Sequence, residues 1–266
     1  MMTLSRFARA FYGLGIAGMG AQQFIYSEFR PVFLTWPSAI PNQSIWAYIA
    51  GGALIIAGLL IAISKKARLV SLAAGIFFLL LFICFHVPNQ VKALEHSRSI
   101  ALAAILGPWI NPLKELALSG GAFIIAVSFA IGRLNAADKF LLVTGRVFFS
   151  IMLIIFGISH FVYTDFVVTL IPAWLPFALF WTYFGAVALI GAGVCILLKI
   201  RIRLVSLLLG VMLFLWFVML HIPRAIKYPG VDKGNELTSV FQALAFSGVA
   251  FILASIYQNR TSRRNN

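Results

Sequence analysis

The chain has 266 residues, of which 62% are hydrophobic and 11% are charged, and its formal net charge is +14. Soluble domains carry roughly 25% charged residues. The composition therefore excludes an ordinary soluble domain and predicts an integral membrane protein. So basic a soluble chain would indicate a nucleic-acid partner, but here the basic residues form short clusters between apolar runs. That pattern indicates membrane topology and no nucleic-acid partner.

Apolar runs of about 18 or more residues can each span a bilayer as a helix. Eight such runs follow one another: Phe7–Tyr26, Ser44–Ile63, Leu69–His86, Leu113–Ile131, Val143–Tyr163, Ala178–Leu198, Leu204–His221 and Leu237–Tyr257. They are continuous, whereas barrel strands alternate in polarity over about ten residues. The predicted fold class is all-α integral membrane, with eight transmembrane helices. Arg6 and Arg9 precede the first run, as in a signal peptide, but this run has a full-length partner in the second half.

The basic residues orient these helices. With a cytoplasmic N-terminus, 14 of the 21 lysines and arginines lie inside: Arg6, Arg9, Lys65, Lys66, Arg68, Arg133, Lys139, Arg146, Lys199, Arg201, Arg203, Arg260, Arg263 and Arg264. Positive charge is retained on the cytoplasmic side. Both termini are therefore expected in the cytoplasm. Of the acidic residues only Asp138 is placed inside.

The two halves of the chain repeat each other. "GAQQFIYSEF" at Gly20 matches "GISHFVYTDF" at Gly157, "RLVSL" occurs at Arg68 and Arg203, "HVP" at His86 matches "HIP" at His221, and "LSGGAFIIA" at Leu118 resembles "FSGVAFILA" at Phe246. This order predicts a tandem duplication with units at residues 1–135 and 136–266. Four helices in each unit make the repeats parallel.

The second half resembles the DoxX-like family of four-helix membrane proteins. The resemblance rests on "GISHF", "LIPAWLPFALFWTYFGAVALIGAG", "RLVSLLLGVMLFLWFVMLHIPR" and "NELTSVFQALAFSGVAFILA". It covers Arg146 to Ile256 well and Arg9 to Ser128 in degenerate form. It implies a multi-pass protein of the bacterial inner membrane. The founding family is associated with thiosulfate:quinone oxidoreductase and other relatives with redox homeostasis, but no catalytic residue is carried over.

Several ionisable residues are predicted to converge at the outer ends of the second-half helices. These are His160, Asp165, His221, Arg224 and Glu236. Ionisable groups at membrane depth are costly and mark functional sites, and histidine makes proton handling available. The alternative is that the histidines only reach the headgroup region, as amphipathic side chains do.

The first half keeps this set in part, because Gln23 and Asn89 replace His160 and Arg224 while His86 and Glu28 remain. This favours the second unit as the working site; the alternative is that both sites have drifted.

The segment Ile171–Pro176 is too short to span a membrane and contains two prolines. It is expected to lie along the outer surface, either as an anchored loop or as a lid over the polar cluster. Trp181, which is repeated as Trp46, favours the lid and is the sixth predicted binding residue. Tryptophan suits the membrane interface.

The sequence offers little for other chemistries. Cys84 and Cys195 are expected about a bilayer apart, beyond disulfide reach, and there is no CxxC. The histidines lack metal-ligand spacing, so no metal site is predicted. No nucleotide fingerprint is present, and the cofactor stays open.

Three functions remain, and whether the protein is an enzyme is left open. The first is a binding or redox subunit that takes a small hydrophobic molecule, such as a quinone or a lipid, at the outer leaflet. The second is a transporter of a small solute or lipid. Coupled transporters usually keep charged residues near the middle of their helices, and none is expected there in this chain, which counts against transport. The third is a membrane scaffold for a partner membrane or redox protein.

Overall fold

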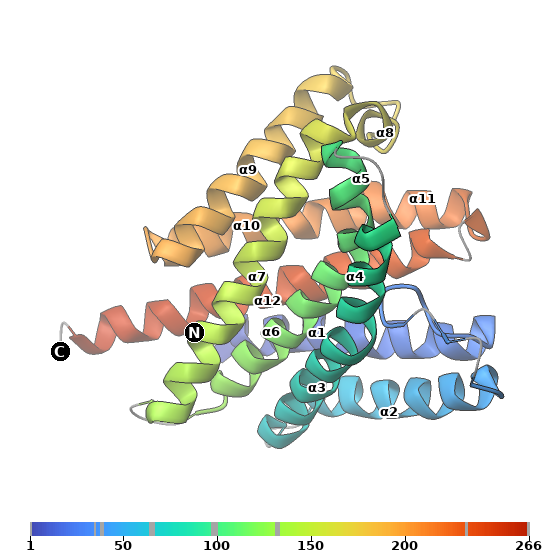
Figure 1. Ribbon diagram of the computed structural model, residues 1–266. Coiled ribbons are helices and arrows are strands. Elements are labelled where there is room, and N and C mark those ends of the chain that lie inside the picture. Colours follow the sequence, from blue (N-terminus) through green and yellow to red (C-terminus); the bar gives the residue numbers. More distant parts are fainter. Residues whose placement is uncertain are drawn as a thin grey trace.

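The structure, a computed structural model, describes residues 2–34, 36–37, 40–63, 67–96, 101–130, 134–231 and 234–264. Its elements in chain order are α1 (Met2–Tyr26), α2 (Gln43–Ile63), α3 (Arg68–Leu81), η1 (Phe82–His86), α4 (Val87–His96), α5 (Leu102–Leu106), η2 (Gly107–Trp109), α6 (Ile110–Val127), α7 (Ala136–Val162), α8 (Thr164–Val168), α9 (Ala178–Leu198), α10 (Ile202–Trp216), η3 (Phe217–His221), α11 (Ile222–Lys227) and α12 (Asn235–Arg264). No strand occurs in these ranges, and long helices dominate the view (Figure 1).

Within the described residues, seven helices are long and apolar enough to cross a membrane: Gln43–Ile63, Arg68–Glu95, Leu102–Val127, Ala136–Val162, Ala178–Leu198, Ile202–Lys227 and Asn235–Gln258. The predicted class, an all-α multi-pass membrane protein, agrees with this result. The first expected crossing, Phe7–Tyr26, coincides with α1, which has 25 residues but is not among the seven. Its polar residues, such as Arg6, Arg9 and Gln22, lower its hydropathy. An eighth crossing therefore stays a prediction.

Three predicted helix boundaries are wrong. The third and seventh helices do not end at His86 and His221, because each continues through a π-helical turn into a further α-helix. A proline follows two residues after each histidine and is typical of a helix end. Here a π-helical turn ends at each histidine, and the helix continues past the proline with this local change of hydrogen bonding. The fourth helical stretch begins at Leu102 and not at Leu113, so Lys114 lies midway along it and not at its start. The expectation of no charged residue near a helix middle is therefore wrong.

The two halves exchange helix contacts. α1 packs between α2 and α12, and α7 packs between α6 and α9, while α3 lies on α6 and α10 lies on α12. The first helix of each half thus packs on the last helix of the other half. α6 and α12 also touch each other, so they form a common wall at the centre of the protein.

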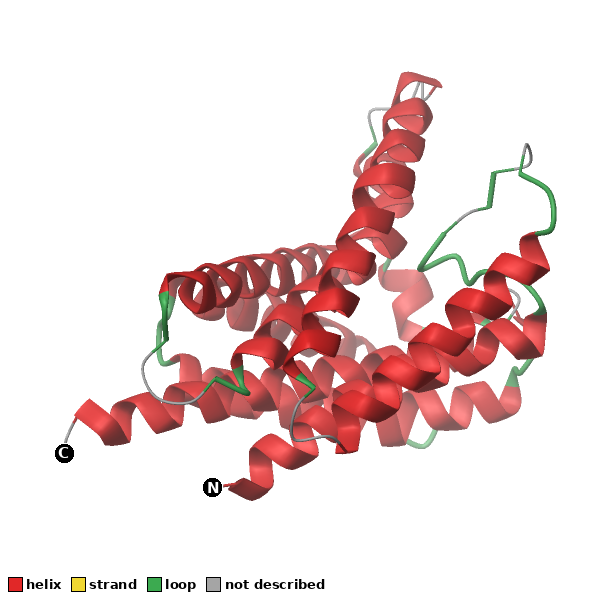
Figure 2. Cartoon of the chain, turned by 90° about the horizontal axis from the view of Figure 1, so that it is seen from below, coloured by secondary structure: helices red, strands yellow, loops and turns green. Residues whose placement is uncertain are grey.

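The contact between α1 and α12 is antiparallel. Gly15 of α1 lies against Ala245 of α12, and further along the Gln22 amide donates to the carbonyl of Gly234 at 3.3 Å. The described chain ends therefore lie at the same end of the bundle (Figures 1 and 2).

Small residues permit the closest helix contacts, as expected in lipid. Gly13 of α1 faces Gly58 of α2, and a Cβ added at either position would collide with the backbone carbonyl of the other. A larger side chain at this crossing would force the two helices apart.

Candidate functional site: a cavity in the second half of the chain

A cavity of about 1210 Å³ lies among α6, α7, α9, α10 and α12. Pockets for drug-sized ligands have volumes of about 300–1,000 Å³, so this one has room for a larger or elongated molecule. Four of its five walls come from the second half, and α6 adds a wall from the first half. The exchange of helix contacts described above is what brings α6 into this site.

The cavity is polar at one end and apolar along the rest of its length. The polar lining residues lie where α7 finishes and where α9 and α12 begin: Asn111, Lys114, Ser159, His160, Tyr163, Thr182, His221, Arg224, Asn235, Glu236, Ser239 and Gln242. α9 lines the cavity from Trp181 to Cys195, and a rise of 1.5 Å per residue makes this stretch about 21 Å long. Leucine, methionine and phenylalanine side chains line the deeper part. The shape and polarity suit a long molecule with one polar end.

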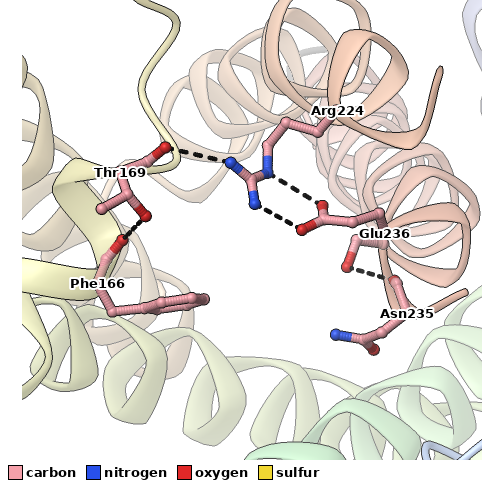
Figure 3. Close-up of polar contacts among 6 residues, drawn as sticks. Phe166, Thr169, Arg224, Asn235 and Glu236 are labelled. Atoms are coloured by element: carbon pink, nitrogen blue, oxygen red, sulfur yellow. Dashed lines mark hydrogen bonds and ion pairs between the residues drawn. The ribbon is translucent and has the colours of Figure 1, made fainter. Parts of the chain in front are cut away.

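An ion pair closes the polar end of the cavity. Arg224 Nε donates to Glu236 Oε2 at 3.1 Å and Arg224 Nη2 donates to Glu236 Oε1 at 2.6 Å. The third donor, Arg224 Nη1, reaches the carbonyl oxygen of Thr169 at 3.1 Å (Figure 3). A bidentate pair of this kind fixes geometry as well as charge. It ties α11 and α12 to the segment after α8.

His160 lies in the last turn of α7 and lines the cavity. Its Nδ1 lies 2.7 Å from the carbonyl oxygen of Phe156, which fixes Nδ1 as the donor. Its ring stacks on Trp216 of α10, with 6.2 Å between ring centroids. In the neutral ring, Nε2 is then left as an acceptor.

His221 ends the π-helical turn η3 and also lines the cavity. Its Nδ1 is buried and has no hydrogen-bond partner among the described residues. Lys114 of α6 lies near enough to interact electrostatically with it. π-helical turns inside α-helices frequently occur at functional sites, and this turn sets the histidine at the polar end of the cavity.

The segment expected to act as a lid contributes to the cavity wall. Ile171, Pro172 and Leu175 line the cavity. The Trp181 indole N–H donates to the carbonyl oxygen of Pro176 at 3.1 Å, so Trp181 fixes the end of this segment. Trp174 points away and is 64% exposed.

Five of the six predicted binding residues line the cavity: His160, Trp181, His221, Arg224 and Glu236. Asp165 lies in the short helix α8, is exposed, and is not among the lining residues. Sequence reasoning missed Lys114 and Gln242. Lys114 belongs to the first half, and only the packing of α6 on α7 shows which cavity it lines.

The corresponding region of the first half is filled by protein. Residues 29–34 fold inward, and Arg30 and Phe33 are 0% and 1% exposed. The Phe33 ring stacks on Phe78 of α3, with 5.8 Å between centroids. The carbonyl oxygen of Val32 lies 3.1 Å from His86 Nε2, the histidine that aligns with His221. The aligned segment of the second half, from Phe166 onward, lies at the rim of the open cavity instead.

Arg30 is held inside this filled region by local contacts. Its guanidinium lies 3.0 Å from a Glu28 carboxylate oxygen and 4.2 Å above the Tyr26 ring. Burial lowers the pKa of Arg30, and Glu28 opposes that shift. Glu28 therefore supports the packing of this loop, whereas the aligned Asp165 is exposed.

Among the side chains that the structure describes, no group of three His, Cys, Asp or Glu residues is placed to hold a metal ion. The cavity itself offers two histidines and one carboxylate already paired with Arg224. The cavity can therefore offer a ligand hydrogen bonds, charge and apolar surface.

Comparison with known proteins gives one match. Residues 149–250 match a family described as a domain of unknown function, DUF8561. The matched range lies in the second half, runs from α7 into α12 and contains most of the cavity lining. No curated protein and no solved structure matches the chain.

Proposed function

We propose that the protein binds a small hydrophobic molecule of the membrane, such as a lipid or a quinone, in the cavity of its second half. The observation that carries this proposal is the pairing of a long apolar cavity with a single polar end. Binding sites for apolar ligands combine apolar walls with a few polar groups that fix orientation. The residues assigned to this role are His160, Trp181, His221, Arg224 and Glu236.

The proposed route from the bilayer into the cavity passes between α9 and α10. The two helices diverge from the short turn that joins them (Figure 1), and each packs mainly on another helix. Two lining residues, Phe184 of α9 and Leu208 of α10, are 49% and 60% exposed. A ligand that follows this route would reach the cavity without crossing the aqueous phase.

The filled first half supports a single working site. Gln23, which aligns with His160, is fully buried, and the loop that follows it occupies the space next to His86. The proposal therefore places ligand binding at His160 and assigns the first half a supporting role. This is why the histidine is needed in one copy only.

The finer architecture belongs to the same proposal. It comprises two parallel four-helix repeats, cytoplasmic termini, a bacterial inner-membrane location and kinship with the DoxX-like proteins. Matching hydrogen bonds support the repeat: Ser119 donates to the Gly75 carbonyl oxygen at 2.8 Å, and the aligned Ser247 donates to that of Gly210 at 3.0 Å. The π-helical turns at Phe82–His86 and Phe217–His221 occupy aligned positions too.

Thermal unfolding in a non-ionic detergent tests the binding proposal. Membrane quinones and lipids should raise the unfolding midpoint of the wild-type protein, because a ligand that binds only the folded state stabilises it. Replacing Gly191 by tryptophan should abolish the rise while leaving the ligand-free midpoint unchanged. Gly191 lines the cavity, and a Cβ there would meet nothing within 4 Å. Failure of every hydrophobic ligand to stabilise the protein would refute the proposal.

Transport is the second candidate, because Lys114 and Glu115 lie midway along a membrane-length helix. Charged residues at such positions mark substrate or ion pathways in transporters. Flux of lipid or solute across proteoliposomes, compared between the wild-type protein and a Glu115→Gln variant, separates transport from binding alone.

A further inference from the structure

The charges at the polar end of the cavity do not balance. Lys114, Arg224 and Glu236 are the lysine, arginine and acidic side chains of the lining. Each carboxylate oxygen of Glu236 accepts one hydrogen bond from Arg224. Lys114 interacts electrostatically with Glu236, but it lies beyond ion-pair distance. The cavity therefore holds two cations that share one carboxylate.

Lys114 forms no hydrogen bond or ion pair within the part of the chain that the structure describes. Its nearest recorded aromatic partner is the Phe156 ring, whose centroid lies 5.6 Å from Nζ. An ammonium group in a largely apolar cavity carries a desolvation cost unless an acceptor is supplied. Water or a ligand must therefore provide that acceptor.

Two other lining residues bring unpartnered nitrogen atoms to the same region. Gln242 Nε2 on α12 and His221 Nδ1 on η3 are buried, and neither has a hydrogen-bond partner among the described residues. The ammonium group and the amide NH₂ can only donate, and the histidine nitrogen donates in one tautomer. Side chains from α6, α12 and η3 thus present hydrogen-bond donors to the cavity. The one carboxylate in the lining, that of Glu236, is already paired with Arg224.

We infer that the molecule bound here is an acyl-chain amphiphile with an anionic oxygen head group, a carboxylate or a phosphate, held by Lys114. The inference rests on the proposed function and names the ligand class for that same cavity. The head group would accept hydrogen bonds from the Lys114 ammonium and the Gln242 amide. The chain would extend along the apolar part between α9 and α10, which is about 21 Å long.

Other ligand classes satisfy the site less well. A neutral quinone or alcohol fills the apolar part and accepts hydrogen bonds, but it leaves the surplus positive charge unpaired. A cationic amphiphile adds a third positive charge beside Lys114 and Arg224. Charge-assisted hydrogen bonds are about twice as strong as neutral ones, so the head group should discriminate between these classes.

Binding of matched sixteen-carbon amphiphiles tests the inference. Palmitate, hexadecyl phosphate, hexadecanol and hexadecyltrimethylammonium are titrated into the wild-type protein in maltoside detergent at neutral pH, and dissociation constants are compared. The two anions should bind on the order of tenfold to hundredfold more tightly than hexadecanol, which is the range expected of one hydrogen bond to a charged group. The difference between palmitate and hexadecyl phosphate shows which anion the site prefers.

Lysine variants locate the effect. Lys114→Gln should remove most of the preference for anions while leaving the affinity for hexadecanol unchanged. Lys227→Gln is the matched control, because Lys227 is exposed on α11, follows Arg224 by three residues, and is not part of the cavity lining. It should keep the preference. If Lys114→Gln does not fold, Lys114→Arg, which keeps the charge, should retain the preference and serves as the second variant.

The outcomes separate the inference from the function on which it rests. Equal affinity for hexadecanol and for both anions in the wild-type protein would overturn the anionic head group and leave a hydrophobic-ligand site standing. An anion preference that persists in a folded Lys114→Gln variant would also overturn it, whatever the result for Lys227→Gln. If none of the four amphiphiles binds, the proposed function fails as well.

Discussion

Lys114 and Glu115 are consecutive residues of α6 that serve different halves of the molecule. Lys114 lines the cavity of the second half, whereas the buried Glu115 carboxylate lies 2.9 Å from His86 Nε2 in the first half. Successive residues on a helix do not share a face, so one helix presents a cation to one side and a carboxylate to the other. α6 is therefore a common wall, and each half of the protein depends on the other.

Replacing the aligned residues Phe29 and Phe166 by alanine should cause very different losses of stability. Phe29 is 9% exposed and stacks on Trp36 with 5.2 Å between ring centroids, whereas Phe166 is 62% exposed. Phe29→Ala should cost on the order of 3 kcal/mol of stability, as for other buried aromatic residues. Phe166→Ala should cost little. Thermal unfolding in detergent measures both, and equal losses would mean that the first-half loop is not packed as described.

Replacing the acidic residues Glu236 and Asp165 by their amides should also have different effects on stability. Glu236→Gln leaves the Arg224 guanidinium partly buried without its carboxylate, and this should cost about 1–3 kcal/mol. Asp165→Asn should leave stability unchanged, because Asp165 is exposed. Chemical denaturation of the two variants provides the comparison. A larger loss for Asp165→Asn than for Glu236→Gln would contradict the assignment of the ion pair.

The histidine present in one copy only gives a matched pair of substitutions. His160→Gln copies the first half into the second, removes the ring that stacks on Trp216, and should reduce the stabilisation caused by a bound ligand. Gln23→His makes the reverse change at a buried position outside the cavity lining. The ligand-induced shift of the unfolding midpoint should survive this second change. If both substitutions leave the shift intact, His160 is an interfacial residue and not part of the site.

The topology predicts accessibility to an impermeant thiol reagent. In a background without Cys84 and Cys195, a cysteine at Gln258 near the end of α12 should be protected in intact cells. A cysteine at the exposed Val231, which precedes α12, should react. The reason is that α12 alone separates these positions and spans a membrane-length segment. Reaction at both positions from outside would refute the proposed orientation.

The sequence predicted most of the helices and most of the polar end of the cavity. Continuous apolar runs define membrane helices directly, and the positions of His160, His221 and Glu236 near predicted helix ends placed them at one end of the second half. The sequence did not predict the tertiary packing. The sequence does not reveal that α6 packs on α7, so Lys114 was missed, and it does not show that Arg30 and Phe33 fold inward while Asp165 faces outward. The sequence pattern also gave no sign of the π-helical turns, so the continuation of two helices beyond His86 and His221 was not predicted.

The most direct test of the cavity as a binding site is photolabelling with an alkyl diazirine probe that carries a sixteen-carbon chain, followed by mapping of the labelled peptides. The wild-type protein should be labelled on the cavity-lining faces of α9 and α10, for instance at Ala188 and Met212, which line the cavity and are half-buried. Gly191→Trp should suppress this labelling and leave labelling of the lipid-facing residues of α2 unchanged. Labelling confined to lipid-facing residues, and equal in the wild-type protein and the Gly191→Trp variant, would contradict the central claim that the cavity binds a membrane molecule.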